Sequence, residues 1–517
     1  MWVSVIGLLC LFVALRWNNF NAPLVRDEGE YAYAAQLLRS GSLPYEHSFL
    51  QKPPMVVYSY ALANLVAPGI WWGPRALACM GIAAATVLLG WVARKEFGVG
   101  TSLTVMWLFT PMVLLPELEE FTANTEMFML LPLLALIALY VANRQRRGSG
   151  WMWLLAGFVG AVAVLYKYTA LPIVLFIMGT WWVETWRRGK SLPELVRGGT
   201  LTAIGAGVAA AASLAVFFAR DGGRALWECT IIFNRYYAGS GLFNLDGLQY
   251  RLGNLWSNWW ILFLLPLGLA GWQVPRMWFW LSLLGLGLLS TGGNPAGHYY
   301  LPMLPAWALL AAVAIRRIGS WANARLPQIS LPMHVPVTAV ALILICLSDY
   351  HWLTRSAESF AKERISGDNP FLESVVVAKK LSEISKPGDK VYVAGSEPQI
   401  LSYARRFSPT RFVIAYPMTL PTPLAGQYQR EAIEDLRTQP PAFIVLARSP
   451  MSWLMQLSTP QDFPKFLDKL LKGEYEPVGA VVFDEAEGRW QEPVTEIEIA
   501  RSSLVLYQKK GHGGANK

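Results

Sequence analysis

Long apolar runs, separated by short charged segments, cover most of the first 350 residues of the chain. A transmembrane helix needs about 20 mainly apolar residues to cross roughly 30 Å of hydrocarbon. About eleven runs approach this length, at residues 1–16, 75–93, 101–116, 124–142, 151–166, 169–186, 199–219, 258–275, 277–291, 299–315 and 333–348. Because the Pro- and Gly-rich runs can break into half-helices, we predict a polytopic α-helical membrane domain of about 11–13 spans over residues 1–350. The first run lacks a basic leader and a cleavage site, which favours a retained helix over a signal peptide.

Two polar segments between the predicted spans, residues 17–74 and 220–257, are longer than simple connectors. The first contains Asp27-x-x-Glu30, which reads as a helix capping box, followed by a helical run that stops at Ser40-Gly41. We therefore expect an interfacial helix that lies at the outer membrane surface.

The composition changes to that of a soluble domain over residues 351–517. Helical patterns at 370–385 and 427–438 alternate with strand-like runs at 391–394, 412–416 and 443–447, and runs at 478–483 and 504–507 complete the set. This alternation predicts a small α/β domain with a mainly parallel sheet. We expect the Gly-rich end, residues 511–517, to be disordered.

The composition supports a membrane protein and excludes a disordered chain or an ordinary cytosolic enzyme. Hydrophobic residues make up 54% of the chain, charged residues 15%, and the mean hydropathy is +0.33. The net charge is +9, and residues from Asp349 onward hold equal numbers of acids and bases, so the excess lies in the apolar region. In the apolar region, an excess of basic residues indicates the orientation of the chain in the membrane and not nucleic-acid binding. Cys10, Cys79 and Cys346 lie in apolar runs and are interpreted as small apolar residues.

Basic residues gather in the loops that would face one side of the membrane. With a cytoplasmic N-terminus, the inner loops carry a large excess of cations, including Arg94, Arg147, Arg188 and Arg316, whereas the longer outer loops are nearly neutral. The positive-inside rule therefore places the N-terminus in the cytoplasm. An odd number of spans then places the C-terminal domain outside.

The first outer segment concentrates charged and aromatic residues, in Arg26-Asp-Glu-Gly-Glu-Tyr31 and Gln51-Lys-Pro-Pro54. Asp27 can be explained as a helix N-cap and Lys52 as a cation that snorkels to the interface. Neither explanation accounts for Glu28 and Lys52 crowding the same boundary. Pro53-Pro54 can start a helix and would hold Lys52 on a stiff support.

A second acidic group begins at Glu117, with Glu119 and Glu120, which we interpret as solvated loop charges. Glu126 differs, because an apolar run follows it at once, and a carboxylate at that depth is a functional candidate. Three more elements face the same side: Lys167, Asn234-Arg235-Tyr236-Tyr237, and His298-Tyr299-Tyr300. Each alone fits an aromatic membrane anchor. Together, cations and carboxylates on one side suit a phosphate-bearing lipid and a hydroxyl nucleophile.

The order of these motifs resembles the GT-C superfamily of polyprenyl-phosphate-dependent glycosyltransferases. The resemblance rests on Asp27-Glu28-x-x-Tyr31, Lys52-Pro-Pro54, Arg75, Asn124-Thr-Glu126, Lys167 and His298-Tyr-Tyr-Leu-Pro302. It is strongest with the lipid A aminoarabinose transferases and the protein O-mannosyltransferases (families 39 and 83), and covers about residues 1–310 and the layout of the C-terminal domain. The chain departs from many of the lipid A enzymes at Glu30, which replaces an arginine, and at Gln51, which replaces an acid.

The resemblance implies a GT-C fold with an extracytoplasmic C-terminal α/β domain, in a bacterial inner membrane. It implies transfer of a sugar from an undecaprenyl-type monophosphate to a hydroxyl of a lipid such as lipid A or lipopolysaccharide, of an envelope glycan, or of a protein. Asp27 would be the general base of an inverting displacement, grouped with Glu28 and Glu126 as catalytic carboxylates. Tyr31, Lys52, Lys167, Arg235, His298 and Tyr299 would bind substrate. A divalent cation stays open as a cofactor, because carboxylates are present without a metal-ligand spacing.

Two other classes of function compete with this interpretation. A secondary transporter would line a permeation path with buried charges, but no matching pair of broken spans is evident and the ionisable groups cluster at one face. A non-catalytic scaffold of an envelope complex would tolerate replacement of Asp27 and Lys52. A transfer assay separates the three classes.

Overall fold

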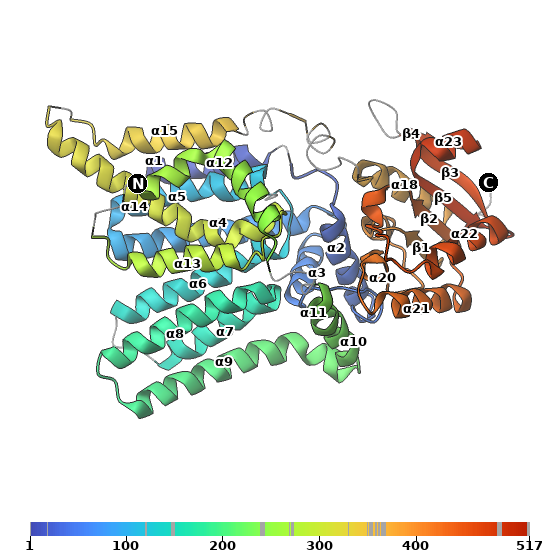
Figure 1. Ribbon diagram of the computed structural model, residues 1–517, viewed down its shortest axis with the longest axis horizontal. Coiled ribbons are helices and arrows are strands. Elements are labelled where there is room, and N and C mark those ends of the chain that lie inside the picture. The colour runs from blue at the N-terminus through green and yellow to red at the C-terminus, as the bar shows by residue number, and fades with distance from the viewer. Residues whose placement is uncertain are drawn as a thin grey trace.

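The computed structural model describes residues 2–513 except for 18, 119–120, 146–149, 238–242, 268, 270–272, 329, 349, 351–354, 357–358, 360–361, 363–368 and 483–488. A helical bundle occupies one end of the molecule, and a domain that contains a sheet occupies the other (Figure 1). Between them lies a layer of short helices that we call the outer layer. It is formed by α2 (Arg26–Arg39), α3 (Met55–Val66), α10 (Gly223–Trp227), a π-helical turn (Glu228–Ile232) and α11 (Phe233–Tyr237).

Each of the eleven predicted spans corresponds to a helix of the bundle. These helices are α1 (Trp2–Arg16), α4 (Gly73–Phe97), α5 (Val99–Leu114), α6 (Thr125–Gln145), α7 (Gly150–Tyr166), α8 (Leu171–Arg187), α9 (Leu192–Ala219), α12 (Leu245–Leu267), α13 (Met277–Leu289), α14 (Leu304–Arg325) and α15 (His334–Ser348). Short 3-10 helices at Pro116–Leu118, Tyr168–Ala170 and Gly297–Met303 adjoin α5, α8 and α14.

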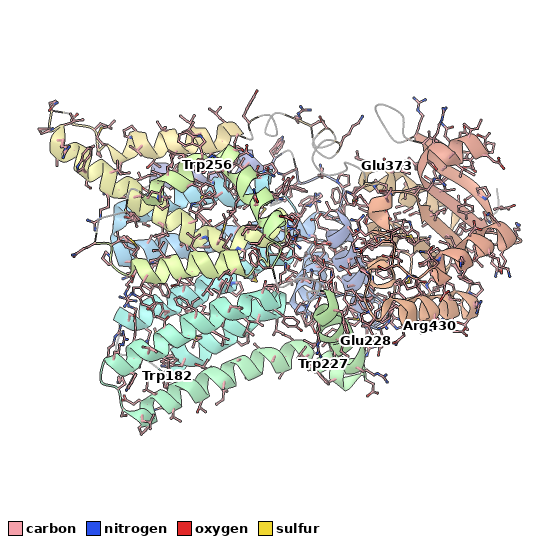
Figure 2. The ribbon with its side chains drawn as sticks, in the orientation of Figure 1. Trp182, Trp227, Glu228, Trp256, Glu373 and Arg430 are labelled. Carbon is pink, nitrogen blue, oxygen red and sulfur yellow. The ribbon has the colours of Figure 1, made fainter. Side chains whose placement is uncertain are left out.

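The bundle has the properties of a membrane domain. Within the described residues, 4 helical segments are long and apolar enough to cross a membrane: Gly73–Phe97, Thr125–Arg144, Leu192–Ala219 and Gly297–Arg325. Large apolar side chains such as Leu9, Phe218 and Trp256 are exposed on the bundle, and Trp256 is labelled in Figure 2. Apolar surface of this extent is stable in lipid and costly in water. The chain is therefore an integral membrane protein.

The span predicted at 258–275 differs most from the structure, because α12 begins 13 residues earlier, at Leu245. Its first half carries Arg251, Asn254 and Asn258, and it is continuous with the apolar half except for non-helical backbone at Trp259. The many polar residues led to its prediction as part of the loop 220–257. The apolar positions Leu248, Leu252 and Leu255 nevertheless recur at helical spacing and face the core.

The helix predicted in the first outer segment is α2, and other parts of the chain bury most of its length. Tyr33 and Ala34 are completely inaccessible. Helix α3 packs on one part of α2, and α19 (Gln399–Ala404) of the C-terminal domain packs on another. The predicted boundary at Ser40 is confirmed, since this residue caps the helix C-terminus.

The C-terminal domain is α/β, as predicted, but its sheet is mixed. Its strands are β1 (Val391–Ala394), β2 (Phe443–Ala447), β3 (Tyr475–Val482), β4 (Arg489–Gln491) and β5 (Ser502–Lys509), in the order β1-β2-β5-β3-β4. Only β1 and β2 pair in parallel, with Val391 opposite Phe443, and the other described pairs are antiparallel. The prediction of a mainly parallel sheet was wrong because β5 inserts between β2 and β3 in the opposite direction, which no local pattern encodes.

The helices of this domain are α18 (Phe371–Ile384), α19, α20 (Tyr416–Thr419), α21 (Ala425–Thr438), α22 (Asp462–Glu474) and α23 (Glu496–Arg501), with a 3-10 turn at Pro450–Ser452. The apolar run 412–416, predicted as a strand, forms bends that lead into α20. Phe412 is buried because it stacks on Phe49, which lies in the segment between α2 and α3, with 5.6 Å between ring centroids. A short apolar run is typical of a buried strand, but here the run is buried by a contact between distant segments.

Polar contacts fix the C-terminal domain onto the outer layer. Arg26 Nε donates a hydrogen bond to the Ser396 carbonyl at 2.7 Å. On another side, Arg411 pairs with Glu228 at 2.9 Å and with Glu431 at 2.6 Å. The domain therefore meets the membrane part of the chain through α2 and the π-helical turn.

Gly29 lies where α2 touches the C-terminal domain. A Cβ atom at this position would lie 2.5 Å from the Gln399 backbone nitrogen, which belongs to α19 and cannot rotate away. We expect Gly29→Ala to destabilise the protein by about 1–3 kcal/mol through overpacking, and to expose the domain junction to protease. Thermal unfolding and limited proteolysis of purified protein measure both effects. Gly81→Ala is the matched control, because Gly81 is also helical and nothing lies within 4 Å of its added Cβ; equal behaviour of the two variants would refute the close packing.

Candidate active site

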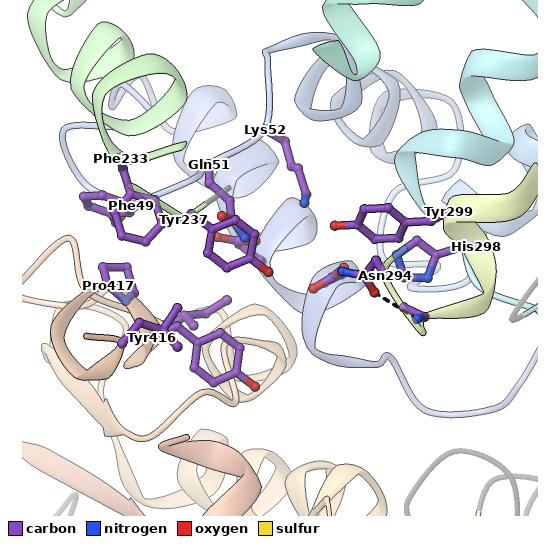
Figure 3. A pocket seen from close by; sticks show the side chains of 15 residues that line it. Phe49, Gln51, Lys52, Phe233, Tyr237, Asn294, His298, Tyr299, Tyr416 and Pro417 are labelled. Carbon is purple, nitrogen blue, oxygen red and sulfur yellow. Dashed lines mark hydrogen bonds between the residues drawn. The ribbon is translucent and has the colours of Figure 1, made fainter. Parts of the chain in front are cut away.

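Three adjoining cavities lie where the bundle, the outer layer and the C-terminal domain meet. The central cavity, of about 200 Å³, is lined by Asp27, Glu30, Lys52, Tyr237, Tyr299 and Tyr416, among others (Figure 3). The bundle-side cavity, of about 760 Å³, is lined by Lys52, Lys167, Asn234, Tyr237, Asn294 and Tyr299, among others. The polar cavity, of about 570 Å³, is lined by Asp27, Thr122, Asn124, Arg251, Asn258 and His298, among others.

The residues that these cavities share show how they connect. Lys52, Tyr237 and Tyr299 line both the central and the bundle-side cavity. Asp27 and His298 line both the central and the polar cavity. The central cavity thus joins the region around Lys52 and Lys167 to a polar region whose lining includes Arg26, Arg251 and Glu117 as well as amides and hydroxyls. Residues from distant parts of the sequence converge there. This agrees with the prediction that their motifs lie on the same side of the membrane domain.

Lys52 is held rigidly by its neighbours in the chain. The Tyr45 hydroxyl donates to the Lys52 carbonyl at 2.9 Å, and Pro53-Pro54 leads directly into α3, which confirms the predicted helix start. The side chain is only 9% exposed, and it points toward the space between the Tyr237 and Tyr299 rings (Figure 3).

The Lys52 ammonium makes no hydrogen bond or ion pair with the residues that the structure describes. Burial alone would lower the pKa of Lys52, but Tyr299 and Asp27 raise that pKa above its ordinary value. A buried cation without a paired carboxylate is suited to an anionic ligand.

Lys167 lies at the end of α7 and pairs with Glu126, the second residue of α6. Its Nζ atom also lies 3.2 Å from the centroid of the Tyr299 ring. Thr125 Oγ1 donates to the second oxygen of Glu126 at 2.7 Å, which completes the support of this carboxylate. Glu126 is buried as predicted, yet it is not among the residues that line the three cavities. Its contacts position Lys167.

Asp27 lies in the first turn of α2 and is not the helix cap that the sequence suggested. The helix begins at Arg26, and Val25 is the N-cap residue. Glu28 takes the capping role, because its carboxylate accepts a hydrogen bond from the Val25 backbone N–H at 3.3 Å. Asp27 makes no hydrogen bond or ion pair within the described parts of the chain. Its carboxylate is therefore available to the central cavity.

Glu28 is fully buried outside the cavities. Arg75 binds it at 2.8 Å and 2.5 Å, and the Ala123 backbone N–H donates to it at 2.8 Å. These bonds fasten the start of α2 to α4 and to the segment before α6. The geometry does not bring Glu28 to the catalytic position proposed from the sequence; it supports the position of its neighbour Asp27.

Two predicted substrate-binding residues also lie apart from the cavities. Tyr31 is buried against Tyr60 of α3, with 5.6 Å between ring centroids, although it follows Asp27 by one helical turn. Arg235 is exposed, whereas Asn234 and Tyr237 of the same short helix line the bundle-side cavity.

The acidic group at Glu117 behaves differently from the prediction of solvated charges. Glu117 is buried and accepts a hydrogen bond from Asn258 at 2.7 Å beside Arg251. Glu119 and Glu120 lie outside the described residues.

Sequence reasoning missed several residues that line the cavities. Tyr416 reaches the central cavity from α20, at the end of the run that was read as a strand, so no local signal marked it. Asn294 lies in Thr-Gly-Gly-Asn-Pro295, a polar turn just before His298, and that turn could have been noticed. Asn254 was hidden in the predicted loop 220–257, and Asn258 was the first residue of the predicted span 258–275.

Glu30 faces the central cavity, although the sequence suggested only a capping role. Burial and the charge of Asp27 raise the pKa of Glu30 well above its ordinary value, against the opposing effect of Lys52. When folding raises the pKa of an acid, the bound proton contributes to the stability of the folded state. This contribution is complete below the unfolded pKa, about 4.3, and is lost as the pH rises through the folded pKa.

We therefore expect Glu30→Gln to be at least as stable as the wild type above about pH 5, with a flatter dependence of Tm on pH. The neutral amide removes the cost of burying a charge at that position. Thermal unfolding of purified protein from about pH 5 to 8 tests this. A Tm well below that of the wild type at neutral pH would show that the fold needs the charged carboxylate.

Among the described residues, no group of three or more His, Cys, Asp or Glu side chains could hold a metal ion.

Comparisons with known proteins identify the fold. No protein-family model matches the chain, and no curated protein matches its sequence.

Solved structures do match over almost the whole chain. ArnT from Cupriavidus metallidurans bound to undecaprenyl phosphate is 14% identical, with 98% of this chain and 97% of that chain covered and a TM-score of 0.59; its apo form gives 0.54. An oligosaccharyltransferase from Archaeoglobus fulgidus, tethered to an acceptor peptide, is 12% identical, with 95% and 74% covered and a TM-score of 0.53. The chain thus has the GT-C fold of these membrane enzymes, as the resemblance in its motifs predicted.

Proposed function

We propose that the chain is an inverting membrane glycosyltransferase, which moves a sugar from a polyprenyl monophosphate to an acceptor hydroxyl. The observation that carries the proposal is the central cavity, where the Asp27 carboxylate faces the same space as the buried Lys52 ammonium, which has no ion-pair partner among the described residues. A base and a phosphate-binding cation at one cavity are the groups that this reaction needs. The matching structures hold undecaprenyl phosphate in one case and an acceptor peptide in the other.

The bundle-side cavity is suited to the donor phosphate. Its lining includes Lys52 and Lys167, together with Tyr168 and Thr169 just before α8 and Ser290 at the end of α13. The pairing of Lys167 with Glu126 offsets one of these charges, so Lys52 supplies the net positive charge. Asn234 holds the loop beside Lys52 by donating to the Gln51 carbonyl at 2.8 Å. A phosphate would accept charge-assisted hydrogen bonds from both lysines in a site that water enters poorly.

The polar cavity is suited to the acceptor. Asn124 is 2% exposed, and its Oδ1 atom has no hydrogen-bond partner among the described residues. A buried acceptor atom without a partner is costly, which favours a ligand that donates a hydrogen bond to it. Asn254 and Thr122 add further polar groups to the same wall. This lining fits an acceptor rich in hydroxyl groups.

The bundle-side cavity, proposed for the donor, and the polar cavity, proposed for the acceptor, meet at the reaction centre in the central cavity. The acceptor oxygen attacks the anomeric carbon of the sugar and forms the new glycosidic bond, while Asp27 takes the proton of the attacking hydroxyl. The bond from the anomeric carbon to the phosphate oxygen breaks, and its electron pair leaves on the lipid phosphate. Lys52 and Lys167 stabilise the charge that develops there. A single displacement inverts the anomeric configuration.

We further propose that the cavities open to the outer face of a bacterial inner membrane. Tags placed after Arg188 and after Lys517 should then lie on opposite sides, the first cytoplasmic and the second outside. The excess of cations in the loops that include Arg94 and Arg188 supports this orientation. Protease protection in spheroplasts and in inverted vesicles measures it. A C-terminal tag that is cleaved only from the cytoplasmic side would reverse the proposed topology.

Mass spectrometry of envelope lipids, glycans and proteins with and without the gene would first reveal the glycan that depends on the protein. Purified protein in proteoliposomes should then transfer that sugar from its polyprenyl monophosphate to the acceptor and release free polyprenyl phosphate. Uptake of a solute by the proteoliposomes, without a new glycosidic bond, would instead establish a transporter and refute the proposal.

A further inference from the structure

A fourth cavity, of about 490 Å³, lies at the opposite end of α2 from Asp27 and shares no lining residue with the other three. We call it the arginine cavity; Gln36, Arg39, Asn64, Trp71, Tyr403 and Arg405 line it. Arg39 is the last residue of α2, and 14 residues of helix span about 20 Å. The arginine cavity is therefore separate from the proposed reaction centre.

The two arginines reach this cavity from different parts of the chain. Arg405 follows α19 in the C-terminal domain with left-handed backbone, φ 52°, and its guanidinium lies against Gly69 in the turn between α3 and α4. Arg39 comes from the outer layer. No carboxylate lines the cavity, and neither arginine forms an ion pair with the described residues. The cavity is therefore positively charged without internal compensation.

Neutral groups complete its walls. Gln36 and Asn64 contribute side-chain amides. The rings of Trp71 and Tyr403 meet edge-on, with 6.1 Å between their centroids. Guanidinium groups beside amides, in a space of this size, are suited to a phosphate, which accepts several hydrogen bonds from planar donors.

Exposed apolar side chains lie in the same segment of the chain as Asn64, Gly69 and Trp71, which line the arginine cavity. Leu62, Leu65 and Val66 at the end of α3 and Ile70 in the following turn are exposed, with Leu65 at 69% and Val66 at 77%. In water this surface would be unfavourable, whereas at a membrane it would contact acyl chains. Cations near a segment with exposed apolar side chains match the headgroup and tail of a phospholipid.

We propose that the arginine cavity binds the phosphate of an anionic membrane phospholipid. This site goes beyond the proposed transferase function. Because Arg405 belongs to the C-terminal domain and Arg39 to α2, the bound phosphate bridges the two and fastens the domain over the outer layer. A soluble phosphate has the same charge chemistry but would leave the exposed apolar side chains of the neighbouring segment unexplained.

Titration of the purified full-length protein in detergent tests the site, with the concentration-dependent rise of Tm as the measure of affinity. The ligands are short-chain phosphatidylglycerol, short-chain phosphatidylcholine and inorganic phosphate. We expect phosphatidylglycerol to stabilise the wild type most, and its apparent affinity to fall about tenfold or more in the double variant Arg39→Gln/Arg405→Asn. Asparagine is chosen at position 405 because it tolerates left-handed backbone.

Arg224→Ala is the matched control, because Arg224 is an exposed cation of the outer layer outside this cavity, and it should bind phosphatidylglycerol like the wild type. Equal stabilisation of the double variant and the wild type by phosphatidylglycerol would refute the site. An arginine-dependent effect that inorganic phosphate reproduces in full would refute the lipid as its ligand. If the double variant does not fold, Arg39→Gln alone, which leaves the backbone at position 405 unchanged, serves for the same comparison.

Discussion

Replacement of Asp27 by asparagine is expected to lower the rate of sugar transfer by about 10²–10⁴, the usual effect of losing a general base. The amide has nearly the same shape as the carboxylate but cannot take the proton of the attacking hydroxyl. Since Asp27 makes no hydrogen bond or ion pair with the described residues, the change should leave the fold and donor binding intact. Single-turnover transfer with saturating donor, on folded and monodisperse protein, measures the loss.

Glu30→Gln is the matched control for this experiment, because it removes a second carboxyl group from the same cavity and the same helix. The raised pKa of Glu30 favours its neutral form, so the amide should retain transfer. Near-normal turnover of Asp27→Asn would remove Asp27 as the base. A large loss in Glu30→Gln together with an active Asp27→Asn would transfer that role to Glu30.

Replacement of Lys52 by alanine is expected to reduce kcat/KM about ten- to hundredfold, because a charge-assisted bond to a phosphate contributes about 1.5–3 kcal/mol. The effect should include weaker donor binding, since the phosphate is charged before and after the reaction. Lys52→Arg should rescue only part of the loss, because the planar guanidinium directs its donors differently in a narrow space between Tyr237 and Tyr299. Donor affinity and specific activity of folded protein are the measurements.

Lys52→Met controls for the loss of the aliphatic stem, because methionine keeps much of its length without the charge. If Lys52 only anchors the chain at the interface, arginine would replace it fully, and both uncharged variants would lower the yield of folded protein with unchanged activity per molecule. Lys167→Ala is less suited to this comparison. It would leave the buried Glu126 carboxylate without its cation and so change stability as well as binding.

The helical spans and the two-part organisation could be predicted from the sequence because they depend on local properties. The length and hydrophobicity of each apolar run determine whether it can form a membrane helix, and every predicted run does correspond to a helix. The helix start after Lys52-Pro-Pro54 could be predicted in the same way, because proline restricts its own backbone. Helix α3 begins directly after this motif.

Pairing between distant segments could not be predicted in the same way. Glu28 and Asp27 are neighbours in one helical turn and look equivalent in the sequence. Of these two carboxylates, Arg75 from α4 binds Glu28 and leaves Asp27 facing the cavity. Likewise, Glu126 and Lys167 form a pair only because α6 and α7 pack together. The direction of β5 in the sheet also depends on the path of the chain and not on its own residues.

The sequence by itself thus determined which segments are helical, which are apolar enough for lipid, and which charged motifs are candidates for chemistry, because hydrophobicity and backbone restriction act within a few residues. Only the tertiary structure decided which candidates reach a common cavity. Adjacent side chains point in directions about 100° apart around α2, so Asp27 faces the cavity while Glu28 is buried against Arg75 of α4. That choice depends on what packs around the helix, and the packing partners come from distant parts of the chain.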